Sequence, residues 1–228
     1  MSLSTRVAMI SGATGGLGRV LARRLADEGC SLVLVGTDAS RLDALASSLP
    51  LGPDRCLTVV ADLRDAASSP AAVDAAIARF GRIDVLAHLV GGYAGGTPLV
   101  ELIPSELNDM LDQHAWTTFH LARAVVPGMT SAGWGRIVAI SPTLVTTPGS
   151  NAAAYTAAKA AQDALLISLA RELKGTGVTA NLVVVRAIDA EHTGKAGWAT
   201  PEQIASAIVY LCSDDAALVN GARIPLTG

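Results

Sequence analysis

Short apolar runs alternate with longer stretches of helical periodicity along the chain. Seven runs have the length and composition of strands: residues 6–11, 31–36, 56–62, 83–90, 136–141, 178–185 and 222–226. The third to sixth runs are rich in Val, Ile and Leu and show little polar alternation, which is typical of strands covered by helices on both faces. The pattern therefore predicts a sheet buried between two layers of helices.

Helix-start signals fall between these runs. Ser69 followed by Pro70 predicts an N-cap and a first helical position, ahead of a helix over residues 71–80. A second signal, a capping box, opens at Thr200. Strands that alternate with helices in this way indicate a Rossmann-type α/β fold, a doubly wound parallel sheet of about seven strands with helices on both faces. We expect residues 1–228 to form a single domain that binds its ligand at the carboxyl ends of the strands.

Composition narrows the class of protein. Hydrophobic residues make up 50% of the chain and charged residues 16%, so a large core can be buried. The formal net charge of −3 argues against a broad basic surface for nucleic acid. No run reaches the ~18 apolar residues of a membrane span, and no signal peptide is evident. Three widely spaced cysteines, Cys30, Cys56 and Cys212, are typical of reduced, buried thiols in a cytoplasmic protein without a metal site.

A glycine-rich turn follows the first predicted strand. Gly12, Gly15, Gly16 and Gly18 precede a helical pattern that runs through Leu25. Glycine is needed where backbone turns sharply or approaches a pyrophosphate closely, and the following helix offers unpaired N–H groups to phosphates. A purely structural turn would use glycine as well, but the position between a first strand and a helix favours dinucleotide binding.

A tyrosine and a lysine four residues apart open a later helix. Tyr155 and Lys159 share one helix face at this spacing, in a helix that continues to about Leu173. A phenol has a pKa near ~10 and is a poor base at neutral pH. A nearby ammonium and a cationic nicotinamide both favour the phenolate. In a chain that also has the glycine-rich turn, the pair indicates an acid/base site rather than two surface residues.

Together these motifs resemble those of the short-chain dehydrogenase/reductase family, in its single-domain branch. The turn over residues 11–18 is similar to the TGxxxGxG turn of that family, and Tyr155 with Lys159 is similar to its YxxxK motif. The same turn satisfies the GxxGxxG pattern of longer epimerase-like relatives, but 228 residues leave no room for their extra substrate domain. The resemblance runs from residue 5 to residue 228.

The resemblance implies an NAD(P)-dependent oxidoreductase that transfers a hydride between a nicotinamide cofactor and the carbonyl or secondary alcohol of a small-molecule substrate. It implies Tyr155 as the catalytic acid/base, and Lys159 as the residue that binds the nicotinamide ribose and lowers the pKa of Tyr155. For Asp62 a helix-capping role is an equally good explanation of the sequence. The cofactor-binding residues that the resemblance implies are Gly12, Gly16, Leu17, Gly18, Thr37, Asp62, Leu63, Gly91, Tyr155 and Lys159.

The end of the second predicted strand bears on the choice between NAD and NADP. Gly36 stands where relatives that prefer NAD carry Asp, and Thr37 stands where many that prefer NADP carry Arg. Asp38 could still reach the ribose, whereas Arg19 or Arg41 could approach a 2′-phosphate. We expect NADP or NAD, with a slight preference for NADP.

Several active-site positions depart from the family pattern. Pro142 stands where relatives carry a catalytic Ser, and proline has no side-chain donor for a substrate carbonyl. Ser141 and Thr143 flank it, but neighbours on an extended segment point to opposite faces. His114 stands where relatives carry an Asn whose main chain holds a water for the lysine. Further differences are His88 and Leu89 in place of two Asn, Arg186 after the sixth strand, and a short substrate loop over residues 189–200.

Two hypotheses about function follow. The first is a working oxidoreductase, favoured by the retained glycines, Tyr155 and Lys159. The second is a catalytically impaired, dinucleotide-binding sensor or partner protein on the same scaffold, favoured by Pro142, Arg186 and the short loop.

Two predicted helices bear on association. The helix over residues 155–173 is rich in Ala and Leu around more of its circumference than one buried face needs. In relatives, this helix and the one over residues 109–129 pack against their copies. We therefore expect a homodimer or homotetramer.

Overall fold

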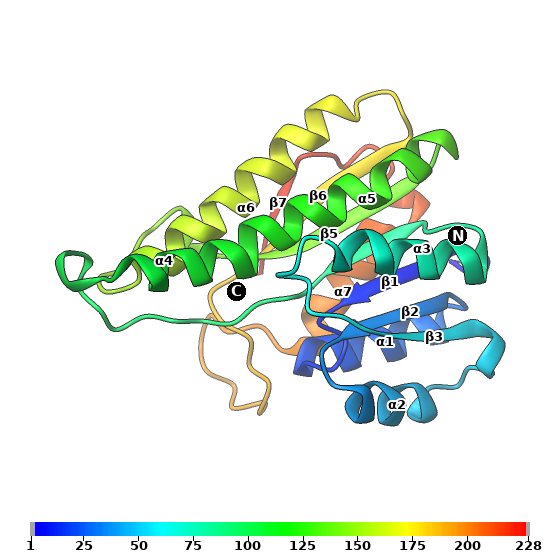
Figure 1. The fold of residues 1–228 in the computed structure, drawn as a ribbon, viewed down its shortest axis with the longest axis horizontal. Helices are drawn as coiled ribbons and strands as arrows, with labels where there is room; N and C mark the ends of the chain where they lie inside the picture. The colour runs from blue at the N-terminus through cyan, green and yellow to red at the C-terminus, as the bar shows by residue number, and fades with distance from the viewer. Residues whose placement is uncertain (1–2, 227–228) are drawn as a thin grey trace.

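The computed structural model describes residues 3–226, which build a sheet of seven parallel strands (Figure 1). The strand order is β3-β2-β1-β4-β5-β6-β7. The strands are β1 (Val7–Ser11), β2 (Ser31–Gly36), β3 (Cys56–Val60), β4 (Val85–His88), β5 (Gly135–Pro142), β6 (Val178–Val185) and β7 (Arg223–Leu226). All seven predicted strands are present, with ends that differ from the prediction by two residues at most. The Rossmann-type fold class is confirmed.

Helices cover both faces of this sheet. On one face lie α1 (Gly16–Asp27), α2 (Ala39–Ser48) and α7 (Pro201–Cys212); on the other lie α3 (Ser68–Phe80), α5 (Thr117–Ser131) and α6 (Ala153–Glu172), with α4 (Pro104–Leu111) beside α6 (Figure 1). Neighbouring residues of β2, Leu32 and Val33, are both fully buried but pack into the two different cores. A strand buried on both faces has no polar positions to alternate, which explains the apolar runs. Within residues 3–226, no helix has the length and apolar character that crossing a bilayer requires.

A π-helical turn interrupts the long helix predicted over residues 109–129. This turn, Asp112–Trp116, joins α4 to α5. A π turn widens the helix and alters the pairing of nearby carbonyls. Thr117 Oγ1 donates to the carbonyl of Gln113 at 2.7 Å, and Thr118 Oγ1 donates to that of His114 at 2.6 Å. The turn therefore fixes His114 at a defined place in the fold.

The two predicted helix starts have different outcomes. The capping box is confirmed, since Thr200 Oγ1 accepts from the Gln203 N–H and the Gln203 side chain accepts from the Thr200 N–H. The predicted N-cap at Ser69 is wrong, because α3 begins at Ser68 and Ser69 lies buried inside its first turn. The Asp65 carboxylate accepts from the Ala67 N–H at 3.0 Å, so a preceding turn starts the helix earlier.

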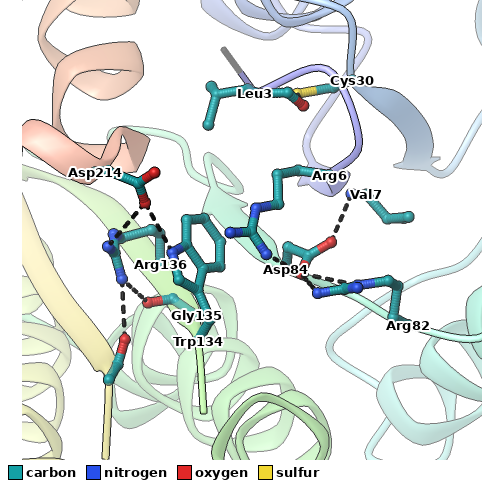
Figure 2. A network of polar contacts seen from close by, with 11 residues as sticks. Leu3, Arg6, Val7, Cys30, Arg82, Asp84, Trp134, Gly135, Arg136 and Asp214 are labelled. Carbon is teal, nitrogen blue, oxygen red and sulfur yellow. Dashed lines mark hydrogen bonds and ion pairs between the residues drawn. The ribbon is translucent and has the colours of Figure 1, made fainter. Parts of the chain in front are cut away.

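The amino ends of β1, β4 and β5 meet in a charged network (Figure 2). Asp84 is buried; its carboxylate accepts from the Val7 N–H at 2.9 Å and from Arg6 at 3.3 Å, and it also pairs with Arg82. The Trp134 ring lies near the guanidinium of Arg6, 3.6 Å from the ring centroid. The network ties strands together at the edge of the sheet opposite to the predicted site.

Candidate functional site

Two adjoining hollows lie over the carboxyl ends of the central strands, where the strand order reverses between β1 and β4. Their volumes are about 390 Å³ and about 280 Å³, and they share Gly12, Gly15 and the segment from Leu89 to Gly91. Open α/β sheets bind ligands in the crevice at such a reversal. Every predicted site residue lines one hollow or both: Gly12, Gly16, Leu17, Gly18, Thr37, Asp62, Leu63, Gly91, Tyr155 and Lys159.

The glycines of the turn differ in what requires them. Gly12 has φ +71°, and a Cβ there would lie 3.0 Å from the Leu89 backbone. A Cβ on Gly18 would collide with the carbonyls of Gly12 and Ala13. Chain packing alone requires these two glycines. At Gly16 an added Cβ would meet, within 4 Å, only Ala190 Cβ at 3.8 Å among the described residues. Gly16 thus leaves open space beside the hollow, as the approach of a ligand requires.

The start of α1 faces this space without a side-chain cap. Its N-cap is Gly15, and no side chain of the described residues makes a cap hydrogen bond there, whereas Asp38 caps α2 and Thr200 caps α7. Free N–H groups and the positive end of the helix dipole favour an anionic ligand there. The turn and the open space at Gly16 therefore fit the pyrophosphate of a dinucleotide.

Arg41 and Asp62 line the larger hollow. Arg41 Nη2 donates to the Thr14 carbonyl at 2.9 Å, and Asp38 caps α2 by accepting from the Arg41 N–H. Asp62 caps no helix, so that alternative is wrong. Its carboxylate instead pairs with Arg64, whose Nη2 lies 2.6 Å from Oδ2, and this hydrogen-bonded pair lowers the pKa of Asp62. Asp62 therefore presents a charged carboxylate to the hollow.

Tyr155 and Lys159 lie in the first turns of α6, at the smaller hollow. The buried Lys159 Nζ donates to the Ile140 carbonyl at 3.0 Å and to Gln162 Oε1 at 3.2 Å. Burial lowers the pKa of Lys159 to about 8, against the opposing effect of the nearby Asp163. Burial also raises the pKa of Tyr155 to about 12. The phenol thus holds its proton firmly, the opposite direction to the lowering expected from Lys159.

Two aromatic side chains flank the Tyr155 ring. The ring of His114 lies edge-to-face at a centroid distance of 5.4 Å, and that of Tyr93 at 5.1 Å. His114 Nε2 lies 3.0 Å from the Gly92 carbonyl, so Nε2 carries the proton and donates. Burial lowers the pKa of His114 to about 3, which keeps the ring neutral. Its Nδ1 is therefore a buried acceptor, and no described residue bonds it.

His88 braces the reversal point between β1 and β4. Its Nδ1 lies 2.7 Å from Ser11 Oγ, and its Nε2 lies 3.2 Å from Thr117 Oγ1. Thr117 uses its own hydroxyl proton on the Gln113 carbonyl, so His88 Nε2 donates and Nδ1 accepts from Ser11. Burial lowers the pKa of His88 to about 3. The side chain is a neutral crosslink among β1, β4 and α5.

Pro142 ends β5, and its flanking residues Ser141 and Thr143 are the nearest donors in the sequence. Ser141 is fully buried, and its hydroxyl donates to Asp163 at 2.7 Å, toward α6. Ile140, the residue before Ser141, packs into the core on the other face of the sheet. Ser141 therefore cannot substitute for the missing serine. Thr143 begins a short 3-10 helix, so the alternation expected of an extended segment does not apply to it.

Comparison with known proteins places this site in a family. The family model for short chain dehydrogenases matches residues 6–199. The chain belongs to the short-chain dehydrogenase family. Similar relatives are subunit BbsC of a hydroxy(phenyl)methylsuccinyl-CoA dehydrogenase from Thauera aromatica, 35% identical over 98% of this chain and 93% of the relative, and D-threitol dehydrogenase from Mycolicibacterium smegmatis, 33% identical over 99% and 93%. The crystal structure of levodione reductase superposes with a TM-score of 0.92 at 28% identity, covering 99% of this chain and 97% of that one.

This short-chain dehydrogenase is an NAD(P)-dependent oxidoreductase of the class that acts on carbonyl or alcohol substrates, as the resemblance implied. The sensor or partner alternative is not favoured. Sequence reasoning missed Tyr93, Gln162 and the Arg64 partner of Asp62. Tyr93 lies in an irregular loop, and Gln162 bonds the Ile140 carbonyl of β5, which is distant in sequence.

Proposed function

We propose that Tyr155 is the acid/base in the interconversion of a ketone or aldehyde and its alcohol. A bound nicotinamide cofactor supplies the hydride to the carbonyl carbon. Tyr155 donates its phenolic proton to the carbonyl oxygen, so that a C–H and an O–H bond form and the alcohol results. In the reverse reaction Tyr155 accepts the alcohol proton as a phenolate, and burial keeps Tyr155 in the neutral, proton-donating form in the absence of cofactor.

One observation carries this proposal: Tyr155, Lys159 and the glycine-rich turn line the same hollow. The turn offers space and N–H groups for the pyrophosphate, and the pair lines the same hollow. The buried ammonium of Lys159 is the cation nearest in sequence to Tyr155, one helical turn away. We propose that it binds the nicotinamide ribose.

We further propose that NADP is the preferred cofactor, with Arg41 as the residue that selects it. The end of β2 carries Gly36 and Thr37 at the larger hollow, and the nearby Asp38 carboxylate is engaged as the cap of α2. Arg41 lines this hollow and also a neighbouring one with Arg19. A guanidinium at that place favours a 2′-phosphate over a free hydroxyl.

Titration with NADH and NADPH, followed by cofactor fluorescence, tests the turn as the pyrophosphate site and Arg41 as the residue that selects NADP. Gly16→Val should weaken the binding of both cofactors. The fold should persist, because the added carbons meet little protein. Arg41→Ala should weaken the binding of NADPH roughly 10- to 100-fold, the effect of one charge-assisted contact, and leave the affinity for NADH unchanged. Equal affinity of Gly16→Val and wild type for both cofactors would show that the turn is not the pyrophosphate site.

A panel of aldehydes and ketones with each reduced cofactor then tests the chemistry. Tyr155→Phe should abolish turnover and keep cofactor affinity, whereas Tyr210→Phe, a change on the exposed face of α7, should leave both unchanged. Undiminished activity of Tyr155→Phe would overturn the assignment of Tyr155.

We also propose a homodimer or homotetramer in the cytoplasm. Exposed apolar side chains on the π turn, α5 and α6, namely Trp116, Phe119 and Leu165, support the self-association. The free thiols Cys30, Cys56 and Cys212 suit a reducing compartment, although Cys56 is only partly buried rather than buried as predicted.

A further inference from the structure

Gln162 carries a polar amide at a buried position, where an apolar side chain is usual. It lies on α6 and is 1% exposed. A buried amide costs free energy unless its polar atoms are hydrogen-bonded. Its partners therefore show what this position does.

Both polar atoms of the Gln162 amide make hydrogen bonds beside the end of β5. Its Nε2 donates to the Ile140 carbonyl at 3.0 Å, and its Oε1 accepts from Lys159 Nζ at 3.2 Å. Lys159 Nζ donates to the same Ile140 carbonyl, at 3.0 Å. The three groups close a triangle that fixes the amide orientation, because a flipped amide would direct its NH₂ group at the ammonium. The backbone of β5 thus anchors Gln162, and Gln162 anchors Lys159.

The charged groups around this triangle leave Lys159 without a bonded carboxylate among the described residues. Asp163 is the nearest acid on α6, but its Oδ2 is engaged by Ser141 and by Arg223 of β7. The remaining titratable neighbours are His88 and His114, which are neutral, together with Tyr155 on α6. The ammonium therefore depends on the neutral acceptors Ile140 and Gln162 for its hydrogen bonds.

Resting on the proposed function, we propose that Gln162 is a positioning residue for catalysis. It holds the Lys159 ammonium at the carboxyl end of β5 and keeps it protonated at the pH where the enzyme works. The lowered pKa of Lys159, about 8, makes this support consequential, since the ammonium has little margin above neutrality.

Lysine NMR tests the proposal without any turnover. The chain has three lysines, Lys159, Lys174 and Lys195, so ¹³Cε-lysine labelling gives three signals, and the signal lost in Lys159→Met identifies the buried one. We would titrate wild type, Gln162→Met and Gln162→Glu against pH. Gln203→Met, which removes a glutamine from the capping box of α7, is the matched control.

Opposite shifts are the expected result. Gln162→Met removes an acceptor, so the Lys159 midpoint should fall by about one pH unit. Gln162→Glu places a carboxylate at the ammonium, so the midpoint should rise by at least as much. Lys174, Lys195 and the Gln203→Met protein should show no change. A Lys159 midpoint that is the same in wild type and both Gln162 variants, or that moves in one direction in both, would overturn the proposal.

Cofactor affinity gives a second readout. If Lys159 binds the ribose as proposed, the loss of affinity at high pH should follow the Lys159 midpoint in each variant. Suppose that the Lys159 midpoint shifts in the variants but the pH dependence of cofactor affinity does not. Gln162 would then still support the Lys159 ammonium, but Lys159 would not bind the cofactor. Should Gln162→Met fail to fold, Gln162→Glu alone still decides the sign.

Discussion

Pro142 stands where relatives carry a serine that donates to the substrate oxygen, and the structure narrows which side chain could take that role. His114 is a poor candidate, because its only N–H donates to the Gly92 carbonyl. Ser141 points into the protein toward Asp163. Thr143, the next residue along the chain, is partly exposed and remains available.

We therefore predict slow turnover on simple ketones and a gain in kcat for Pro142→Ser. The gain is bounded at about 10²–10³-fold, the usual worth of one donor to a developing oxyanion, and it is reduced because removing proline loosens the segment. Steady-state rates of Pro142→Ser and Thr143→Val measure this. If Thr143 already supplies the donor, Thr143→Val abolishes activity while Pro142→Ser changes little, which is the result that contradicts the prediction.

The site residues differ in how far sequence alone could find them. The ten motif residues all line the hollows, because strand ends and a glycine-rich turn fix backbone positions that a pattern can record. Gln162 is invisible to such patterns, since its partner Ile140 lies 22 residues away on another element. Sequence also could not separate Gly18, which the chain needs for packing, from Gly16, which leaves room for a ligand.

Elements were predictable where one residue pattern decides them. The apolar runs located all seven strands, because each run is too short for a helix and alternates with helical patterns. The edge strands β3 and β7 are only partly buried, whereas the five between them are mostly buried. The start of α3 and the π turn at Asp112–Trp116 were not predictable. In the first case the side chain of Asp65 competes with Ser69 for the start of the helix, and in the second the pairing of backbone carbonyls with Thr117 and Thr118 changes the helix type without changing its periodicity.

The charged network at the amino ends of the strands should dominate the stability of the sheet edge (Figure 2). We predict that Asp84→Ala lowers the free energy of unfolding by about 2–4 kcal/mol, because it leaves the buried Val7 N–H without its acceptor and two arginines unpaired. Urea unfolding measures the change. Asp54→Ala, which removes an exposed ion pair with Arg79, is the control and should behave as wild type. Equal unfolding midpoints for the two variants would show that the network is dispensable.

At the scale of the whole molecule, the outer face of α5 and α6 is exposed. A hollow of about 390 Å³ runs between these helices and is lined mainly by apolar side chains, among them Phe119, Val126 and Leu165. Helices α5 and α6 bury their other faces against the sheet, so this outer face is exposed in the single chain. A patch that meets its own copy across a two-fold axis contributes each residue twice.

We predict a dimer or tetramer in solution that Leu165→Arg disrupts. Leu165 is only 37% exposed, so covering the rest of its side chain contributes about 1 kcal/mol per copy at most, and most of the expected cost comes from the two arginine charges buried in the symmetric interface. The dissociation constant should rise by about 10³-fold or more, which converts the protein to monomer at micromolar concentration by light scattering. Ile77→Arg is the matched control, since Ile77 on α3 is 40% exposed against 37% for Leu165 but lies on a different helix. A wild-type protein that is monomeric at micromolar concentration would reject the association itself. An oligomer that survives Leu165→Arg but not Ile77→Arg would move the interface from α5 and α6 to α3.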